Sequence, residues 1–149
     1  MIRPAKNFEA NLLSEIAFSS KAYWGYDAAF MESCRKELTL TEAMVTSDFC
    51  YVIEDSNKLL GFYLLKALHN DHLEIDMFFI EPAFTGKGLG AKLFKHAVDL
   101  AKSKNFKYLE IQSDPFAQAF YEKMGAKVVE YTPSLSIPNR TLPLMLFAL

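Results

Sequence analysis

The stretch that decides the fold is Pro82-Ala83-Phe84-Thr85-Gly86-Lys87-Gly88-Leu89-Gly90, in which three glycines stand at alternate positions. An apolar, strand-like run precedes it, and a pattern of helical period follows it. Such a turn leaves several backbone N–H groups unpaired, and the helix N-terminus behind it adds a partial positive charge. The stretch therefore indicates a strand, an anion-binding turn and a helix.

Taken alone, this turn is equally consistent with a tight strand-to-helix connection that binds nothing. A nucleotide P-loop needs a Ser or Thr directly after a Gly-Lys pair, and none follows in register here. A dinucleotide-binding fingerprint needs a third glycine three residues after Gly90, where Leu93 stands. The turn excludes these two classes and leaves its ligand open.

Bulk composition limits the remaining classes. The 149 residues are enough for one domain, residues 1–149, and the 51% hydrophobic content argues against disorder. A net charge of −2 gives no basic field for nucleic acid, and no apolar run reaches the length of a membrane span. We therefore expect a cytoplasmic protein without nucleic-acid or membrane partners. Cys34 and Cys50 are expected to be buried thiols, and the three histidines lack metal-ligand spacing with them, so no metal site is predicted.

The rest of the chain predicts an antiparallel meander before the glycine turn and a strand–helix–strand unit around it. Strands are expected at 2–5, 49–54, 59–68, 72–80, 108–112, 126–131 and 142–148, with turns at 55–58 and 69–71 and a loop bracketed by Pro133, Pro138 and Pro143. Helices are expected to begin at the caps Asn7, Asp27 and Asp114, and over residues 87–104. This order indicates a mixed α/β fold with one parallel strand pair.

A second constellation follows the predicted strand at 108–112. The run Asp114-Pro115-Phe116-Ala117-Gln118-Ala119-Phe120-Tyr121-Glu122-Lys123-Met124-Gly125-Ala126 places a tyrosine late on a helix that glycine ends. Together with the glycine turn, it resembles the GNAT acetyltransferase family. The resemblance implies a central, mostly antiparallel sheet that splays at one parallel strand pair and is flanked by about four helices. It also implies acetyl-CoA as co-substrate and no metal.

The resemblance assigns coenzyme-binding roles to the turn and the strand before it. The pyrophosphate would lie on Thr85, Gly86, Lys87, Gly88, Leu89, Gly90 and Ala91, with Asp114 nearby. Backbone groups of Phe78, Phe79 and Ile80 would pair with the pantetheine arm and the acetyl carbonyl, while their side chains pack.

The sequence departs from the family pattern at three positions. Thr85 stands where Arg or Gln is usual, Asp114 where Asn is common, and Ala126 where Phe is usual. The backbone cradle should survive the first change, and the third is interpreted as a packing change. The charge of Asp114 would be unfavourable beside coenzyme phosphates unless it points away.

The resemblance also places Tyr121 beside the coenzyme sulfur, where acetyl transfer requires a proton for the leaving thiolate. An ordinary phenol pKa of about 10 keeps tyrosine protonated at neutral pH, so Tyr121 is the predicted general acid. The alternative is a core aromatic beside Phe116 and Phe120. For the general base, Glu74 and Asp76 are the candidates, expected by alternation to share a strand face with Phe78. Glu110 is a third candidate, and water could relay the proton if all three are solvated.

Acceptor contacts are expected from residues outside the two motifs. The resemblance implies that the aromatic segment at Tyr23-Trp24-Gly25-Tyr26 lines the acceptor side of the cleft, so Trp24 or Tyr26 is expected to contact the acceptor, with core or lid packing as the alternative. Arg140 would bind an anionic acceptor group or pair with a structural carboxylate. The leading hypothesis is an acetyl-CoA-dependent N-acetyltransferase that acts on a primary amine of a small molecule or protein by direct transfer. A non-catalytic acyl-CoA-binding or interaction module is the alternative, and a homodimer is left open.

Overall fold

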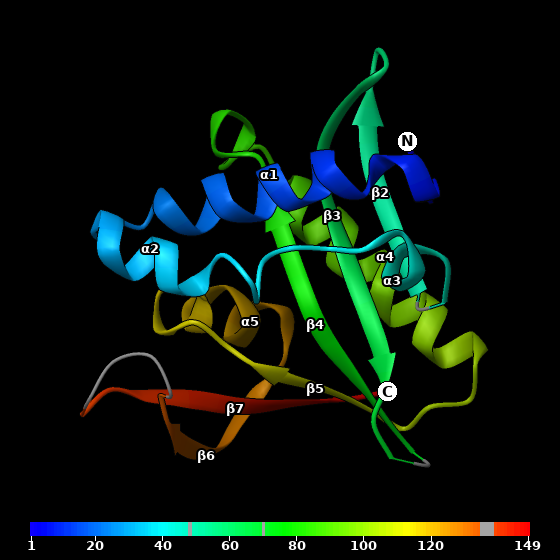
Figure 1. Ribbon diagram of the computed structural model, residues 1–149. Coiled ribbons are helices and arrows are strands. Elements are labelled where there is room, and N and C mark those ends of the chain that lie inside the picture. Colours follow the sequence, from blue (N-terminus) through cyan, green and yellow to red (C-terminus); the bar gives the residue numbers. More distant parts are fainter. Residues whose placement is uncertain (48, 70, 135–138) are drawn as a thin grey trace.

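A mixed β-sheet forms the centre of the protein (Figure 1). The computed structural model describes residues 1–47, 49–69, 71–134 and 139–149. The seven strands lie in the order β1-β2-β3-β4-β5-β7-β6, and β4 and β5 form the parallel pair. The strands are β1 (Ile2–Pro4), β2 (Phe49–Asp55), β3 (Lys58–Ala67), β4 (His72–Ile80), β5 (Tyr108–Gln112), β6 (Lys127–Pro133) and β7 (Thr141–Ala148). The predicted mixed α/β architecture is confirmed.

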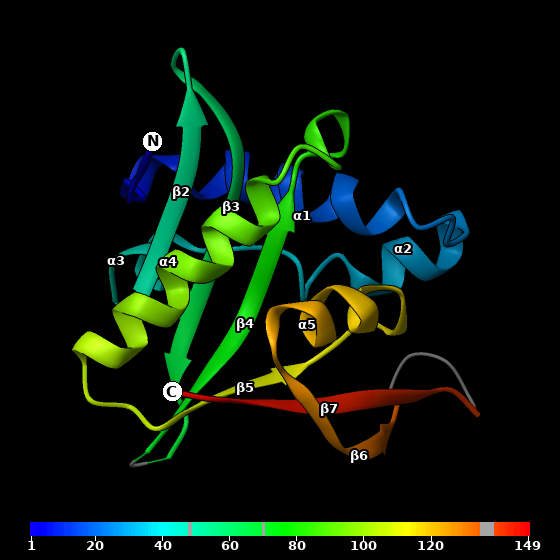
Figure 2. The same ribbon diagram turned by 180° about the vertical axis from the view of Figure 1, so that it is seen from behind.

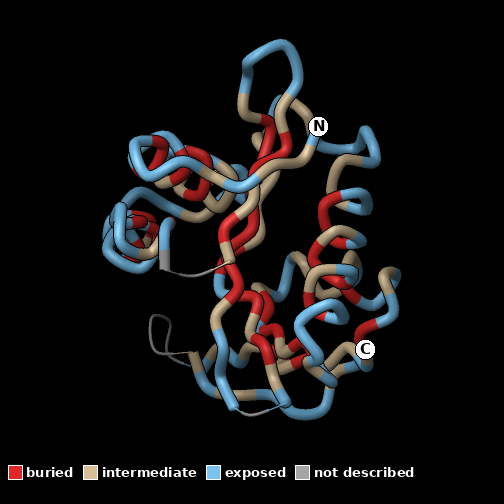
Figure 3. The backbone as a smooth tube through the Cα atoms, turned by 90° about the vertical axis from the view of Figure 1, so that its right-hand side faces the viewer, coloured by how far each residue is buried: buried red, intermediate tan, exposed pale blue. Residues whose placement is uncertain are grey.

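Helices cover both faces of the sheet. The helices are α1 (Ala10–Ala22), α2 (Ala28–Cys34), α3 (Glu42–Ser47), α4 (Leu89–Ser103) and α5 (Gln118–Met124), with short 3-10 turns at Asn7–Glu9, Pro82–Phe84 and Pro115–Ala117. α1 and α2 lie on one face, and α4 and α5 on the other (Figure 2). The buried segments follow the central strands and the inner sides of the helices (Figure 3). No helix within the described residues is long and apolar enough to cross a membrane.

Two apolar clusters hold these layers together. One packs Leu93, Ala97 and Ala101 of α4 against the sheet, and Tyr121 of α5 belongs to it. The other packs Leu13, Ile16 and Ala17 of α1 against the opposite face. The helical and period-two spacings in the sequence anticipate these contacts, because each helix buries one stripe.

Local signals gave most element boundaries to within about two residues, with three differences. Asp27 caps α2 as predicted, its side chain accepting from the Phe30 N–H at 2.8 Å. Asn7 begins a 3-10 turn instead of capping α1, because buried Glu9 accepts the Lys6 N–H at 2.8 Å and turns the chain there. The helix expected to include Leu38 ends at Cys34, and α3 was not predicted. Asn70 and Pro138, assigned to a turn and a loop, lie outside the described residues.

A β-bulge in β4 interrupts the alternation of the strand. Leu64 pairs with Met77 and Leu65 with Ile75, so Asp76 has no partner in β3. As a result, Ile75 and Phe78 pack in the α4 cluster, whereas Met77 packs on the α1 side. The prediction that Phe78 shares a face with Glu74 and Asp76 is therefore wrong, because strict alternation does not hold across a bulge.

The parallel pair separates beyond this bulge. β4 pairs with β5 from His72↔Tyr108 to Ile75↔Ile111, and residues 77–80 pair with β3 alone. The two strands then diverge, with α5 beside the opening (Figure 2). The splayed parallel pair implied by the sequence is confirmed, and it leaves one edge of β4 free.

Candidate active site

A large cleft opens where β4 and β5 diverge. Its volume is about 1140 Å³, and its walls come from β4, the glycine turn, α5, the end of β5 and the α1–α2 region. Typical small-molecule sites occupy about 300–1,000 Å³. The cleft is therefore large enough for an extended ligand together with a second reactant.

The glycine turn forms one wall of this cleft. Gly86 and Gly88 have φ of +79° and +77°, in the left-handed region that favours glycine, and a Cβ at either position would meet open space. Within the described part of the chain, no backbone N–H from Gly86 to Ala91 has a hydrogen-bond acceptor. A run of free N–H groups at a helix N-terminus is an anion-binding arrangement.

Neighbouring side chains hold the turn and add positive charge. The Thr85 hydroxyl donates to the Pro82 carbonyl at 3.0 Å, which fixes the loop without the Arg or Gln usual there. Gly90 provides room for α5, because a Cβ there would lie 3.1 Å from the Phe120 ring. Lys87 does not line the cleft; its Nζ lies 5.5 Å from the centre of the Phe84 ring at the edge of the turn.

The free edge of β4 forms the floor. The Glu81 N–H donates to the Leu60 carbonyl at 2.7 Å, and the Phe79 carbonyl also faces β3, where it would lie 2.6 Å from a Cβ on Gly61. Because alternate residues of an antiparallel strand face the same edge, Phe78 and Ile80 direct their backbone groups toward the cleft. The Ile80 carbonyl accepts a hydrogen bond from the Ser20 hydroxyl at 2.5 Å, a contact between distant positions that no local pattern predicts.

Tyr121 lies at the junction of the cleft and the core. Its ring packs against Phe78, Phe94 and Phe120, with centroid distances of 6.1, 6.1 and 5.2 Å. The residue is 6% exposed and lines the cleft, and its hydroxyl makes no hydrogen bond with the described residues. Burial, and then the negative charge of Asp114, raise the pKa of this phenol above its ordinary value. The ring thus packs in the core, as the alternative interpretation expects, while its hydroxyl lies unpartnered at the cleft among the described residues, and its role as the general acid stays a prediction.

The three candidate bases have different environments. Glu74 lines the cleft, and burial, followed by the charge of Asp76, raises the pKa of its carboxyl. Asp76 also lines the cleft but pairs with Lys66 at 3.4 Å. Glu110 lies outside the cleft wall and is held by His72, whose Nδ1 lies 2.5 Å from its carboxylate. Glu74 is thus a cleft carboxyl whose pKa is raised and which has no ion-pair partner among the described residues.

Asp114 connects three separate segments at the far end of the cleft. Its Oδ1 caps the turn before α5 by accepting the Phe116 N–H at 2.9 Å. Its Oδ2 accepts the Tyr26 hydroxyl at 2.8 Å and lies 3.3 Å from Arg140 and 3.5 Å from Lys21. Arg140 therefore pairs with a structural carboxylate, one of the two alternatives open from the sequence. The unfavourable charge expected of Asp114 is neutralised locally.

The two predicted acceptor aromatics have different positions. Trp24 lines the cleft and stacks on Phe116, with ring centroids 5.4 Å apart and planes 9° apart. Tyr26 does not line the cleft, and burial and its hydrogen bond to Asp114 raise the pKa of its phenol. Tyr26 holds Asp114, while Trp24 with Phe116 presents an aromatic wall.

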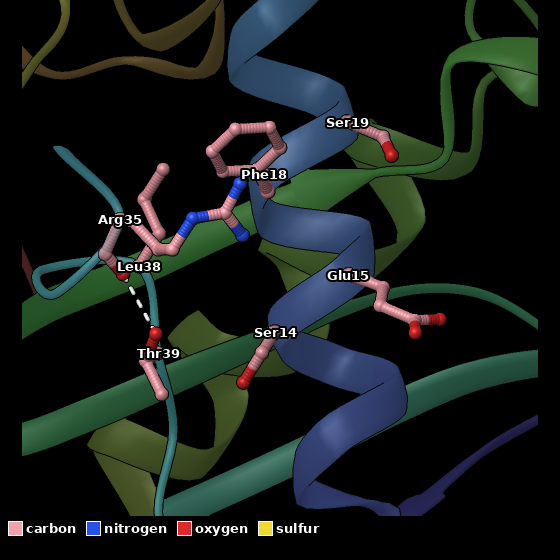
Figure 4. A pocket seen from close by; sticks show the side chains of 7 residues that line it. All are labelled: Ser14, Glu15, Phe18, Ser19, Arg35, Leu38 and Thr39. Carbon is pink, nitrogen blue, oxygen red and sulfur yellow. Dashed lines mark hydrogen bonds between the residues drawn. The ribbon is translucent and has the colours of Figure 1, made fainter. Parts of the chain in front are cut away.

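A second, smaller hollow lies between α1 and the segment after α2 (Figure 4). Its volume is about 160 Å³, enough for a few water molecules at about 30 Å³ each. The Arg35 guanidinium lies 4.2 Å from the centre of the Phe18 ring beside it, and the Thr39 hydroxyl donates to the Arg35 carbonyl at 2.7 Å. This hollow is too small for a coenzyme.

Sequence reasoning missed several residues that line the cleft. Lys21, Glu37 and Phe116 line the cleft, yet each stands in an unremarkable local pattern. Position in the fold, and not residue spacing, brings these side chains to the site.

No group of three or more His, Cys, Asp or Glu side chains among the described residues is arranged to hold a metal ion.

Comparison with known proteins identifies this arrangement. Residues 15–126 match the model of the acetyltransferase (GNAT) family. A stretch of 76 residues, 51% of this chain and 48% of the relative, is 37% identical to the peptidyl-lysine N-acetyltransferase YjaB of Salmonella typhimurium. The match thus spans about half the length of that relative.

Solved structures show the same fold. The PaiA N-acetyltransferase of Thermoplasma acidophilum, in complex with coenzyme A, has a TM-score of 0.82 at 21% identity, over 100% of this chain and 98% of that one. The ribosomal-protein-S18-alanine N-acetyltransferase of Escherichia coli has a TM-score of 0.72 at 14% identity, over 99% and 92%. The chain belongs to the GNAT acetyltransferase family.

Proposed function

We propose that this protein is an acetyl-CoA-dependent N-acetyltransferase that moves the acetyl group directly to a primary amine. The observation that carries the proposal is the run of free N–H groups from Gly86 to Ala91, which faces the same cleft as the unpartnered Tyr121 hydroxyl. An anion cradle and a buried proton donor in one cleft are what a pyrophosphate-bearing thioester requires.

The cradle and the β4 edge would hold the coenzyme. The pyrophosphate would accept hydrogen bonds from the turn at Gly86 to Ala91, with Lys87 as a nearby positive charge. The backbone groups of Phe78 and the Ile80 N–H would pair with the pantetheine amides, as an added strand pairs with a sheet edge, whereas the Ile80 carbonyl already accepts the Ser20 hydroxyl. A backbone N–H on this edge would also stabilise the acetyl oxygen as negative charge develops on it.

Tyr121 would act as the general acid. The amine nitrogen forms a bond to the acetyl carbon, the carbon–sulfur bond breaks, and the Tyr121 hydroxyl donates a proton to the departing sulfur. A raised phenol pKa keeps this proton in place at neutral pH before transfer. The ring packing against Phe78 and Phe94 fixes the direction of the hydroxyl.

Glu74 would take the proton that the amine loses, directly or through water. Its raised pKa makes it a stronger base than an ordinary carboxylate. Asp76, whose charge is partly compensated by Lys66, would support the same face of the cleft. The acceptor amine would approach from this side, along the wall formed by Trp24 and Phe116.

The acceptor class includes small primary amines and the lysine side chain, the group named for the Salmonella relative. Coenzyme A release should therefore be measured with acetyl-CoA, a set of small amines and a lysine-containing peptide. Release with at least one amine, and a mass increase of one acetyl group on that amine, is the expected result. The alternative binding module would be stabilised by acetyl-CoA against heat but would release no thiol with any amine.

A further inference from the structure

We propose that Asp114 determines acceptor specificity by neutralising Lys21 and Arg140, so that the cleft disfavours amines that carry a carboxylate. The inference rests on the proposed function and names the acceptor class that this site would take. It starts from an unusual feature of the cleft: two cations on its wall are committed to one internal carboxylate.

The geometry pairs both cations with the same carboxylate. Arg140 Nη2 lies 2.5 Å from the Tyr26 hydroxyl and 3.3 Å from Asp114 Oδ2, and its guanidinium lies 5.0 Å from the centre of the Tyr26 ring. Lys21 Nζ lies 3.5 Å from the same oxygen and 5.7 Å from the Tyr26 and Phe30 rings. The side chains of Lys21, Asp114 and Arg140 are at most 20% exposed, and Tyr26 is partly buried. Solvent therefore screens these pairs only partly.

Acidic side chains outnumber the remaining cations of the cleft. Glu37, Glu74 and Asp76 line it, and Lys66 offsets only the last of these. With Lys21 and Arg140 paired to Asp114, Lys123 on α5 is the one lining cation without an ion pair among the described residues, so an incoming carboxylate would meet an excess of negative charge. An acceptor with a second ammonium group would meet favourable charge.

The chemistry of position 114 makes the inference testable. Oδ1 caps the turn before α5, and Oδ2 holds the two cations. Asparagine retains an oxygen for the cap but has no charge, so Asp114→Asn should keep the local fold and release Lys21 and Arg140. The substitution thus keeps the capping oxygen, which asparagine also has, and removes the negative charge that holds the two cations.

The experiment compares three short primary amines of matched length: propylamine, β-alanine and diaminopropane, which are neutral, anionic and cationic at the far end. For the natural sequence, we expect kcat/KM for β-alanine to be at least about tenfold below that for propylamine, and diaminopropane to equal or exceed propylamine. In Asp114→Asn, the ratio of β-alanine to propylamine should rise at least about fivefold. Adding Arg140→Gln to that variant should lower the ratio again.

Asp99→Asn is the matched control, because it removes a carboxylate from an exposed ion pair with Lys95 on α4. Thermal unfolding of each variant checks that the fold is retained. If Asp114→Asn does not fold, Arg140→Gln alone is measured instead, and it should leave the order of kcat/KM among the three amines as in the natural sequence. A preference of the natural sequence for β-alanine overturns this inference while supporting acetyl transfer. An unchanged ratio in Asp114→Asn also overturns it. No coenzyme A release with any amine overturns the proposed function itself.

Discussion

Replacing Tyr121 with phenylalanine should abolish most of the activity and leave the fold intact. The substitution keeps the ring, and with it the contacts to Phe78, Phe94 and Phe120. It removes a hydroxyl that has no hydrogen-bond partner among the described residues. The change therefore separates the chemical role of the side chain from its packing role.

The expected magnitudes follow from this environment. Loss of a positioned general acid lowers the rate by about 10²–10⁴-fold. No buried side-chain oxygen among the described residues lacks a partner, so the Tyr121 hydroxyl reaches the solvent of the cleft and its removal recovers no desolvation cost. The free energy of unfolding should therefore change by less than about 1 kcal/mol, or about 2–4 °C in Tm for a domain of this size.

Two measurements on the same preparation check the prediction. Coenzyme A release under saturating acetyl-CoA should fall at least a hundredfold, and the Tm should change by no more than about 2–4 °C. The Kd for acetyl-CoA should change little, because the cradle at Gly86 to Ala91 is untouched. Full activity of Tyr121→Phe would refute the assignment of the acid, and a large loss of Tm would show that the hydroxyl is structurally paired.

Two further predictions concern titratable groups. Burial raises the pKa of the Glu74 carboxyl, so kcat/KM should fall as the pH drops through that raised pKa. Glu74→Gln should lower kcat/KM at least about tenfold at pH 7 and remove this acidic limb of the pH profile, whereas an unchanged limb would assign the base elsewhere. Hydrogen bonds from Arg3 lower the pKa of the buried Glu9 carboxyl, so its stabilisation is present above the unfolded-state pKa of about 4.3 and is lost as the pH falls through the folded-state pKa. Glu9→Gln should therefore cost about 2 kcal/mol at pH 7 and much less once the pH is below the folded-state pKa, by thermal unfolding across a pH series, and an equal cost throughout would contradict the ionic origin.

Features that depend on local chemistry were predictable from the sequence. The glycine turn was recognisable because Gly86 and Gly88 adopt positive φ, a conformation that other residues adopt at a cost. The start of α5 was recognisable because Asp114 and Pro115 are a cap and a first-turn residue. Strand and helix periods located most of the remaining elements, because each buries one face.

Features that depend on distant contacts were not predictable. The bulge at Asp76 has no residue signature, and it moves Phe78 to the face opposite the one that alternation assigned. The contacts among Tyr26, Asp114 and Arg140 join residues whose separation in the sequence is between 26 and 114 residues. No spacing rule predicts contacts over such separations. The acceptor end of the cleft is formed by such contacts, which explains why its residues were predicted least completely.

The proposed function requires that the glycine turn binds the pyrophosphate of acetyl-CoA. Calorimetric titration of acetyl-CoA into Gly88→Ala, with Gly25→Ala as control, measures this contribution. Both glycines have positive φ and open space at the Cβ position, so both variants carry a similar strain of about 1–2 kcal/mol. Gly88 borders the cradle, whereas Gly25 lies in the α1–α2 connection. We predict that Gly25→Ala binds as the natural sequence does and that Gly88→Ala binds at least tenfold more weakly. Equal affinity of the two folded variants would contradict the account.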